Sequence, residues 1–237
     1  MTQGRGWEGA VLRLLRAKDF EFTVTRAEDI TPHYRRLRLT DGGMLAATGV
    51  HPTMWVRLWF DNAGKPHQRA YTLVDPDPAV GTFGLDFALH EGRASDWARS
   101  AKPGDTIEAT VQGTGFEAPD PAPSHLFVAG DPASVPAVNS LLGSVGSTVP
   151  ATIWFEGEPD GLPLRTDPDH HEIRALPRGR LTERIRTELP DLLKATPDPY
   201  IWITCDTTTT RALSSYVRKE LGLRRERVHA LGYWRAT

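Results

Sequence analysis

The feature that most constrains the fold is a change of hydrophobic pattern on either side of a proline-rich segment near the middle of the chain. Before residue 117, hydrophobic and polar residues alternate in short runs separated by turn residues, which is typical of antiparallel strands. After residue 124, short apolar runs alternate with longer stretches of helical period. Residues 117–124 contain Pro119, Pro121 and Pro123, and each proline restrains itself and the residue before it. We therefore expect two domains joined by a stiff linker.

The first half of the chain predicts an antiparallel β-barrel. Turn sequences such as Asp41-Gly42-Gly43 and Asp75-Pro76-Asp77-Pro78 separate runs of period two, and short strands at this spacing are typical of a barrel. The expected strands cover residues 20–26, 34–39, 54–60, 83–89 and 106–111, with another strand after Pro66 and a helix over residues 94–101.

The second half predicts an α/β domain built on a parallel sheet. Alternating strands and helices form βαβ units, and such units place binding loops at the carboxyl ends of their strands. The expected strands cover residues 125–129, 151–155, 200–205 and 228–233, and the expected helices cover residues 135–142, 182–193, capped by Thr182, and 207–221.

These patterns predict an extension over residues 1–19, a barrel over 20–116, a linker over 117–124 and an α/β domain over 125–237. The extension reads either as a short amphipathic helix or as a frayed terminus, because short helices need tertiary support. Arg13 and Arg16 interrupt its apolar residues, which argues against the hydrophobic region of a signal peptide.

Composition excludes several classes of protein. The chain has 237 residues, 39% of them hydrophobic, so it has enough apolar surface for a sizeable core. A formal net charge of -2 argues against nucleic acid or an anionic membrane as a partner, and no apolar run is long enough to span a bilayer. The lone Cys205 excludes a disulfide framework and a multi-cysteine metal site. We expect a cytoplasmic protein, monomeric or weakly dimeric.

The first informative motif is Arg69-Ala70-Tyr71-Thr72, which lies on the strand after Pro66. Residues two apart share one face of a strand, so Arg69 and Tyr71 together offer a guanidinium for a phosphate and an aromatic ring for a flat heterocycle. Taken alone, the motif favours the alternative of a surface arginine beside a half-buried tyrosine, and only its context points to a flavin.

The second motif follows about twenty residues later, where a strand ends at His90, Gly92 allows close approach and Ser95 opens a helix. Backbone N–H groups at a helix start, with the helix dipole behind them, bind phosphate. The alternative is an ordinary helix N-cap by Ser95.

Together these stretches resemble the siderophore-interacting protein family, which are flavin reductases within the ferredoxin-NADP reductase-like superfamily. The resemblance extends over roughly residues 20–235. Four stretches carry it in the expected order, namely residues 69–72, residues 86–98, Phe127-Val128-Ala129-Gly130-Asp131 with Val135-Pro136-Ala137, and Gly232-Tyr233-Trp234-Arg235. The resemblance implies an FAD-binding barrel followed by an NAD(P)H-binding domain.

The resemblance also implies roles for individual residues. Arg69 would hold the FAD phosphates, Tyr71 would pack on the isoalloxazine and Thr72 would bond near its N5. Ala94 and Ser95 would donate to the pyrophosphate, and His90 is either a flavin contact or a core histidine bonded to backbone. The complete set implied for FAD is Arg69, Ala70, Tyr71, Thr72, His90, Gly92, Arg93, Ala94 and Ser95.

The sequence departs from the family at several of these positions. Val74 stands where the family commonly has a second arginine, and Arg93 stands where it commonly has proline, so Arg93 supplies a replacement charge. In the second domain, Pro132 and Ala133 replace an acidic-threonine pair, and Thr204-Cys205-Asp206 replaces Ala-Gly-Glu. The residues implied for the nicotinamide nucleotide are Gly130, Asp131, Cys205, Asp206 and Arg211, and we expect weak binding there.

Three further features have two readings each. Cys205 ends a strand where related reductases place a cysteine beside the nicotinamide, but a buried inert thiol is the alternative. The hydroxyl run 207–210 predicts either a phosphate site or simple capping. The pair His170-His171 lies among acidic residues, but no third ligand follows at regular spacing, so a surface loop is favoured over a metal site.

The resemblance implies FAD-dependent reduction of a ferric siderophore with NAD(P)H as the donor, and the protein itself ligates no iron. Arg57 and Arg235 are the expected substrate contacts, whereas Arg36 and Arg38 fit a solvated strand face. Asp96 stands at a position where the family usually has a basic residue. This difference favours a neutral ferric hydroxamate as the substrate. The alternatives are a related flavin reductase with another acceptor or a ferredoxin-linked donor, and a siderophore-binding module without turnover.

Overall fold

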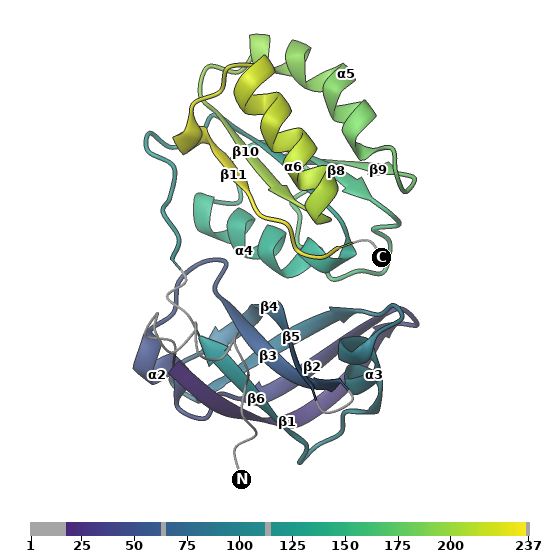
Figure 1. Ribbon diagram of the computed structural model, residues 1–237. Helices are drawn as coiled ribbons and strands as arrows, with labels where there is room; N and C mark the ends of the chain where they lie inside the picture. Colours follow the sequence, from purple (N-terminus) through teal and green to yellow (C-terminus); the bar gives the residue numbers. More distant parts are fainter. Residues whose placement is uncertain (1–17, 63–64, 112–114, 236–237) are drawn as a thin grey trace. The chain divides into compact units, whose positions relative to one another are not determined.

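The computed structural model describes residues 18–62, 65–111 and 115–235, and the chain divides into two compact units between Phe116 and Glu117. The first unit is a closed antiparallel barrel, as the sequence predicts, with strand order β1-β2-β5-β4-β3-β6 (Figure 1). The helix considered within residues 1–17 lies outside the described residues. The strands are β1 (Lys18–Thr31), β2 (Tyr34–Thr40), β3 (Trp55–Asn62), β4 (Lys65–Asp77), β5 (Thr82–Ala88) and β6 (Thr106–Val111).

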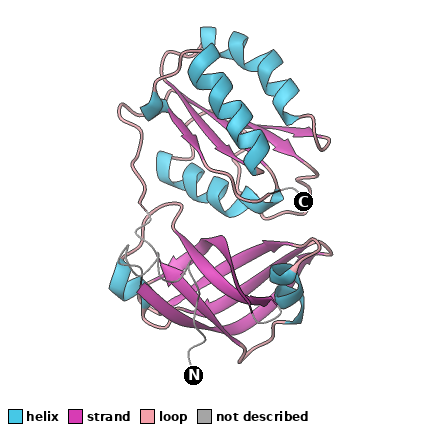
Figure 2. Ribbon diagram, in the orientation of Figure 1, coloured by secondary structure: helices cyan, strands magenta, loops and turns pink. Residues whose placement is uncertain are grey.

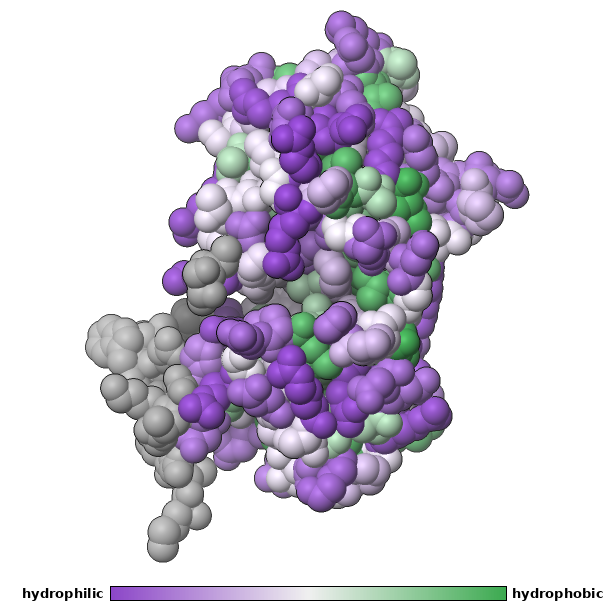
Figure 3. Space-filling view, turned by 90° about the vertical axis from the view of Figure 1, so that its right-hand side faces the viewer, coloured by the Kyte–Doolittle hydropathy of each residue, from purple (hydrophilic) through white to green (hydrophobic). Residues whose placement is uncertain are grey.

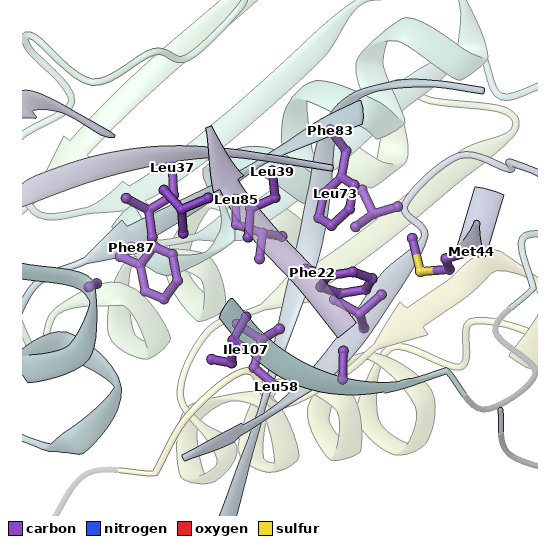
Figure 4. Close-up of a cluster of buried hydrophobic side chains, with 14 of the residues drawn as sticks. Phe22, Leu37, Leu39, Met44, Leu58, Leu73, Phe83, Leu85, Phe87 and Ile107 are labelled. Carbon is purple, nitrogen blue, oxygen red and sulfur yellow. The ribbon is translucent and has the colours of Figure 1, made fainter. Parts of the chain in front are cut away.

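The barrel interior is filled by the alternate residues of its strands. Along β3, for example, Val56, Leu58 and Phe60 are buried inside, which follows from the period of two in a strand. Figure 4 shows how apolar side chains from different strands converge. The labelled members of this core are Phe22, Leu37, Leu39, Met44, Leu58, Leu73, Phe83, Leu85, Phe87 and Ile107.

Two helices accompany the barrel. Helix α3 (Arg93–Ser100) matches the expected helix closely, whereas the short α2 (Met44–Thr48) was not expected. The Asp41 carboxylate accepts hydrogen bonds from the amides of Gly43 and Leu45 at 2.9 and 2.7 Å, and it thereby stabilises this single turn. A helix this short has no recognisable periodicity in the sequence.

The interpretation of Arg36 as part of a solvated strand face is wrong. Arg36 lies directly opposite Asp86 in the β2–β5 register, and its Nε and one terminal nitrogen donate to the two carboxylate oxygens at 2.6 and 2.7 Å. The Asp86 side chain is fully buried and also accepts from the Tyr34 hydroxyl at 3.2 Å. The hydrogen bonds that Arg36 donates to Asp86 raise the pKa of the Arg36 guanidinium. Arg38, by contrast, is 41% exposed.

We predict that Arg36→Met lowers the free energy of unfolding by about 3–5 kcal/mol, because the substitution leaves the Asp86 carboxylate buried without its cation. Arg38→Met is the matched control on the same strand, and it removes only an exposed ion pair worth less than about 1 kcal/mol. Urea unfolding of both variants measures the difference, and equal losses would contradict this assignment.

The second unit is a parallel sheet with order β11-β10-β7-β8-β9. Its strands are β7 (His125–Gly130), β8 (Ala151–Glu156), β9 (His171–Leu176), β10 (Pro199–Thr204) and β11 (Val228–Ala230). Helix α4 (Val135–Val145) covers one face, and α5 (Leu181–Lys194) and α6 (Thr207–Ser215) cover the other (Figure 2). Two short helical turns, η1 (Pro132–Ser134) and η3 (Arg225–Arg227), precede α4 and β11, and a π-helical turn η2 (Tyr216–Glu220) follows α6.

Three expectations for this unit are wrong in detail. Helix α5 begins at Leu181, so Thr182 lies inside it and does not cap it. The last strand ends at Ala230. Strand β9 was not expected: the predicted surface loop holds for His170, but His171 is buried and begins this edge strand. Among the described residues, no cluster of metal-ligating side chains is found.

The surface of the described residues carries few large apolar side chains. On the face shown in Figure 3, hydrophobic residues are interspersed with hydrophilic ones. Within the described ranges, no helix is long and apolar enough to cross a membrane. The exposed large hydrophobic residues are Val50, Val80, Ile173 and Leu231.

Candidate functional site

Arg69 and Tyr71 lie on one face of β4, as their spacing predicts. In the β3–β4 register, Arg69 is opposite Leu58 and Tyr71 is opposite Val56, and directly opposed residues of an antiparallel pair share a face. The Arg69 guanidinium is exposed and donates to the carbonyl of Gln68 at 2.9 Å. This pair therefore presents a cation and an aromatic ring on one side of the strand.

Tyr71 belongs to a cluster of four aromatic side chains, Phe60, Tyr71, Phe87 and Trp97, which we term the aromatic cluster. The Tyr71 ring centroid lies 4.4 Å from that of Phe87 and 6.5 Å from that of Phe60. Trp97 of helix α3 contacts the same two rings at 6.0 and 5.8 Å. Burial in this cluster raises the pKa of the Tyr71 hydroxyl, while the charge of Arg69 opposes the shift. The cluster joins β4 to the helix of the second motif.

Ala70 and Thr72 lie on the other face of β4. Ala70 is opposite Arg57, and Thr72 is opposite Trp55. Arg57 and Thr72 are therefore diagonal neighbours on one face, a relation that spans about 7–8 Å in antiparallel sheets. The Arg57 guanidinium lies 4.7 Å from the centre of the Trp55 ring, an arrangement that holds a cation in place.

The second motif forms a loop that leads from β5 into α3. Gly92 has φ 133° and ψ 162°, a conformation that favours glycine. Ser95 does not open the helix as expected: it is the third helical residue, and its Oγ accepts a hydrogen bond from the His90 amide at 3.1 Å. The alternative of an N-cap by Ser95 is therefore wrong as well. Strand β5 ends at Ala88, two residues earlier than expected.

The loop is held together from both sides. His90 is exposed, so it is not a core histidine, and its Nδ1 lies 2.5 Å from the Glu91 carbonyl oxygen. Arg99 of α3 donates to the His90 carbonyl at 3.1 Å. In the part of the chain that the structure describes, no side chain caps the start of α3, where the first N–H groups of a helix need acceptors. The exposed Arg93 is the first residue of this helix. These residues fit an anionic phosphate group.

Val74, which replaces the usual second arginine, is buried against the opposite strand. It pairs with Gly84 in the β4–β5 register, and a Cβ added at Gly84 would lie 3.2 Å from the Val74 Cβ. The valine therefore contributes packing in place of a positive charge.

In the second unit, the carboxyl end of β7 is closed by an aspartate. The Asp131 carboxylate accepts from the Ala133 amide at 2.9 Å and from the Trp234 indole N–H at 2.6 Å. The Ser134 hydroxyl bonds both backbone groups of Asp131, and a Cβ at Gly130 would lie 2.6 Å from the Ser134 Oγ. Burial raises the pKa of Asp131 to about 6, although the hydrogen bond from Trp234 acts to lower it.

A second aspartate closes the carboxyl end of β10. Asp206 caps α6 by accepting from the amides of Thr208 and Thr209 at 2.8 and 3.1 Å, and the Thr207 amide and hydroxyl both donate to the Trp234 carbonyl at 2.8 Å. The hydroxyl run is thus part of a capped helix start, which favours the capping alternative over a phosphate site. Arg211 remains exposed on α6.

Cys205 lies beneath this capped end. Its side chain is fully buried, its Sγ lies 3.4 Å from the Thr210 Oγ1, and burial raises the pKa of the thiol to about 12. These properties favour the alternative of an inert thiol. The exposed Arg235 follows Trp234, whose ring centre lies 6.0 Å from the Arg178 guanidinium. The bond from Trp234 to Asp131 has no signal in the sequence, because a distance of 103 residues separates its partners.

Two family models match this chain: the siderophore-interacting FAD-binding domain over residues 53–113, and the siderophore-interacting protein over residues 123–237. The chain belongs to the siderophore-interacting protein family. Its family membership agrees with the four stretches that carry the resemblance. All four lie within the described residues: on β4, in the loop that leads into α3, at the carboxyl end of β7, and in the stretch 232–235, whose Trp234 bonds Asp131.

This chain is similar to curated proteins of different lengths. The mycobactin import ATP-binding/permease protein IrtA of Mycolicibacterium smegmatis is 34% identical over 241 residues, which cover 97% of this chain. The present chain spans only 27% of the length of that relative. The ferric acinetobactin reductase of Acinetobacter baumannii is 26% identical over 191 residues, or 78% of this chain and 67% of the relative.

Solved structures show the same fold. The siderophore-interacting protein of Acinetobacter baumannii has a TM-score of 0.78 at 24% identity and covers 92% of this chain and 91% of its own. The ferredoxin NADP+ reductase of Neisseria gonorrhoeae with bound FAD and NADP has a TM-score of 0.68 at 14% identity, covering 92% and 99%. The fold of this chain is therefore similar to that of ferredoxin NADP+ reductases.

The buried Asp131 predicts a pH-dependent difference in stability. Its pKa in the folded state, about 6, lies above the ordinary 3.8, so the folded state binds more protons than the unfolded state between these values, and ionisation lowers stability as pH rises. Asp131→Asn removes this effect. The unfolding free energy of the variant minus that of the wild type should rise by up to about 3 kcal/mol from pH 4 to pH 7. A constant difference would contradict the raised pKa.

Proposed function

We propose that this chain is an FAD-dependent reductase of ferric siderophores that takes electrons from NAD(P)H. The observation that carries the proposal is the aromatic cluster, because it joins the strand of Arg69 and Tyr71 to helix α3, whose start is uncapped among the described residues. A cation, an aromatic ring and the amides of a helix start on adjoining elements suit a flavin dinucleotide.

In this proposal, different residues of the barrel unit contact different parts of FAD. Arg69 would hold the pyrophosphate, and the amides of Ala94 and Ser95 at the start of α3 would donate to it. Tyr71 would pack against the flavin ring, and Thr72 would hydrogen-bond near its N5. Ala70, His90, Gly92 and Arg93 complete the set. When bound, FAD supplies two-electron acceptance from a nicotinamide and single-electron delivery to an acceptor.

The substrate in this proposal is the ferric chelate, and the protein contributes charge rather than iron ligands. Siderophore oxygens are hard ligands that suit Fe(III) better than Fe(II), so reduction releases the metal. Arg57 lies on the same strand face as Thr72, which supports a role beside the flavin edge, and Arg235 is the second candidate. The name of IrtA makes a mycobactin-type chelate one substrate to test.

The nicotinamide side is the weaker half of the proposal. Gly130, Asp131, Cys205 and Asp206 surround the carboxyl ends of β7 and β10, but both helix starts there use aspartates as internal caps. Negative charge opposes a nucleotide phosphate, and Arg211 is the cation that this set offers. This arrangement favours a second candidate, the same reductase supplied by a ferredoxin-type donor.

Substitution of Arg69 tests the flavin site. Arg69→Ala removes charge-assisted hydrogen bonds worth about 1.5–3 kcal/mol, so FAD affinity should fall by about 10- to 150-fold. Titration of apoprotein with FAD measures this loss, and Arg26→Ala, at an exposed position outside the proposed site, controls for the loss of one positive charge. A wild type that is colourless and binds no FAD would refute the reductase, and an unchanged affinity in Arg69→Ala would refute the role of Arg69.

Charge reversal tests the substrate contacts. In the double variant Arg57→Glu and Arg235→Glu, we expect the KM for an anionic ferric catecholate to rise at least tenfold, while the flavin spectrum and turnover with a neutral dye stay close to wild type. The double variant Arg26→Glu and Arg224→Glu, at exposed positions, controls for net charge. Equal losses with both acceptors would show damage to the fold or the flavin site instead.

A further inference from the structure

Strand β2 and the turn before it contact both ends of the segment that carries the loop and helix α3. Before the loop, the Leu89 amide donates to the His33 carbonyl at 2.8 Å. After the helix, a terminal nitrogen of Arg35 donates to the Ala101 carbonyl at 3.2 Å. The two contacts come from residues two apart, His33 in the turn before β2 and Arg35 on β2, so this end of β2 sets the position of the whole segment.

Arg35 makes this second contact from a confined position. Its side chain is 15% exposed, and its other terminal nitrogen bonds the carboxylate of Asp29 on β1. It lies opposite Phe87 in the β2–β5 register, next to a member of the aromatic cluster. The planar guanidinium therefore bridges β1 and the end of α3 in a fixed geometry, which a flexible ammonium does not reproduce.

Ala101 is the C-cap of α3, and its carbonyl is one of those that the helix leaves unpaired. A cation at this end also interacts favourably with the helix dipole. At the other end, the bonds from the His90 amide to Ser95 and from Arg99 to the His90 carbonyl join loop and helix. Displacement at the C-terminal end of this short helix therefore also moves its N-terminal end.

We propose that Arg35 is a positioning residue for the flavin pyrophosphate, acting through helix α3. The inference rests on the proposed function, and it extends the site to a side chain that reaches the opposite end of the helix from the phosphate. Loss of the Arg35 guanidinium would tilt the amides of α3 away from the pyrophosphate but leave the ring of Tyr71 in place. The effect is thus specific to flavins that carry a pyrophosphate.

The test compares FAD with riboflavin, which has the ring but no phosphate, on apoprotein of each variant. Arg35→Met should weaken FAD binding by about tenfold, the loss of roughly one oriented hydrogen-bond donor, and change riboflavin binding by less than about twofold. Arg35→Lys keeps the charge but does not reproduce the guanidinium bridge, so it should weaken FAD binding by a smaller factor, about threefold, and leave riboflavin binding unchanged. Arg38→Met, on the same strand, should leave both affinities unchanged.

Each result decides between the alternatives. Equal weakening of FAD and riboflavin in Arg35→Met, or FAD affinity equal to wild type, would overturn the positioning role. If Arg35→Met does not fold, Arg35→Lys carries the same comparison, and equal changes for both flavins would again overturn the role. A wild type that binds no FAD would contradict the proposed function and this inference with it, whereas normal FAD binding by wild type and variants alike would overturn the inference alone.

Discussion

The candidate flavin site depends on packing among the four rings of the aromatic cluster. Phe60, Tyr71 and Phe87 come from three different strands and Trp97 comes from α3, so one cluster fixes the strand motif and the helix start relative to each other. Aromatic pairs at these distances add stability beyond the area they bury. The barrel is closed, which leaves these elements little freedom to separate. A phosphate cradle and a ring platform therefore belong to one rigid part of the molecule.

In the second unit, aspartates cap the helix starts at the carboxyl edge of the sheet. Parallel sheets normally present helix starts there to ligands, but Asp131 and Asp206 occupy the helix amides, and Trp234 bonds both regions. The sequence differs from the family pattern at Pro132, Ala133 and the stretch 204–206, which lie in the same regions. The capped helix starts agree with the weak nucleotide binding that these differences predict. The proposed flavin site and the proposed nucleotide site thus differ in whether an aspartate already caps the helix start. On this criterion the flavin site suits an anionic ligand better.

Much of the fold was predictable because period-two and helical patterns survive in single segments. The barrel strands and the βαβ units follow from them, whereas α2 and β9 are too short or too polar to give a pattern. Interactions between distant residues were not predictable. The Arg36–Asp86 pair looked like a solvated face, because alternation alone does not reveal a buried cross-strand partner. Ser95 resembled an N-cap, but its hydroxyl accepts a hydrogen bond from the His90 amide in the preceding loop.

The central claim is that flavin bound to this chain delivers electrons to a chelated ferric ion. The most direct measurement mixes photoreduced holoprotein with a ferric siderophore under anaerobic conditions, in the presence of a chelator that colours only with Fe(II). The account predicts that the absorbance of oxidised flavin returns while about two ferrous ions are trapped per flavin. A flavin that stays reduced in the presence of excess ferric siderophore, with no ferrous complex formed, would contradict it.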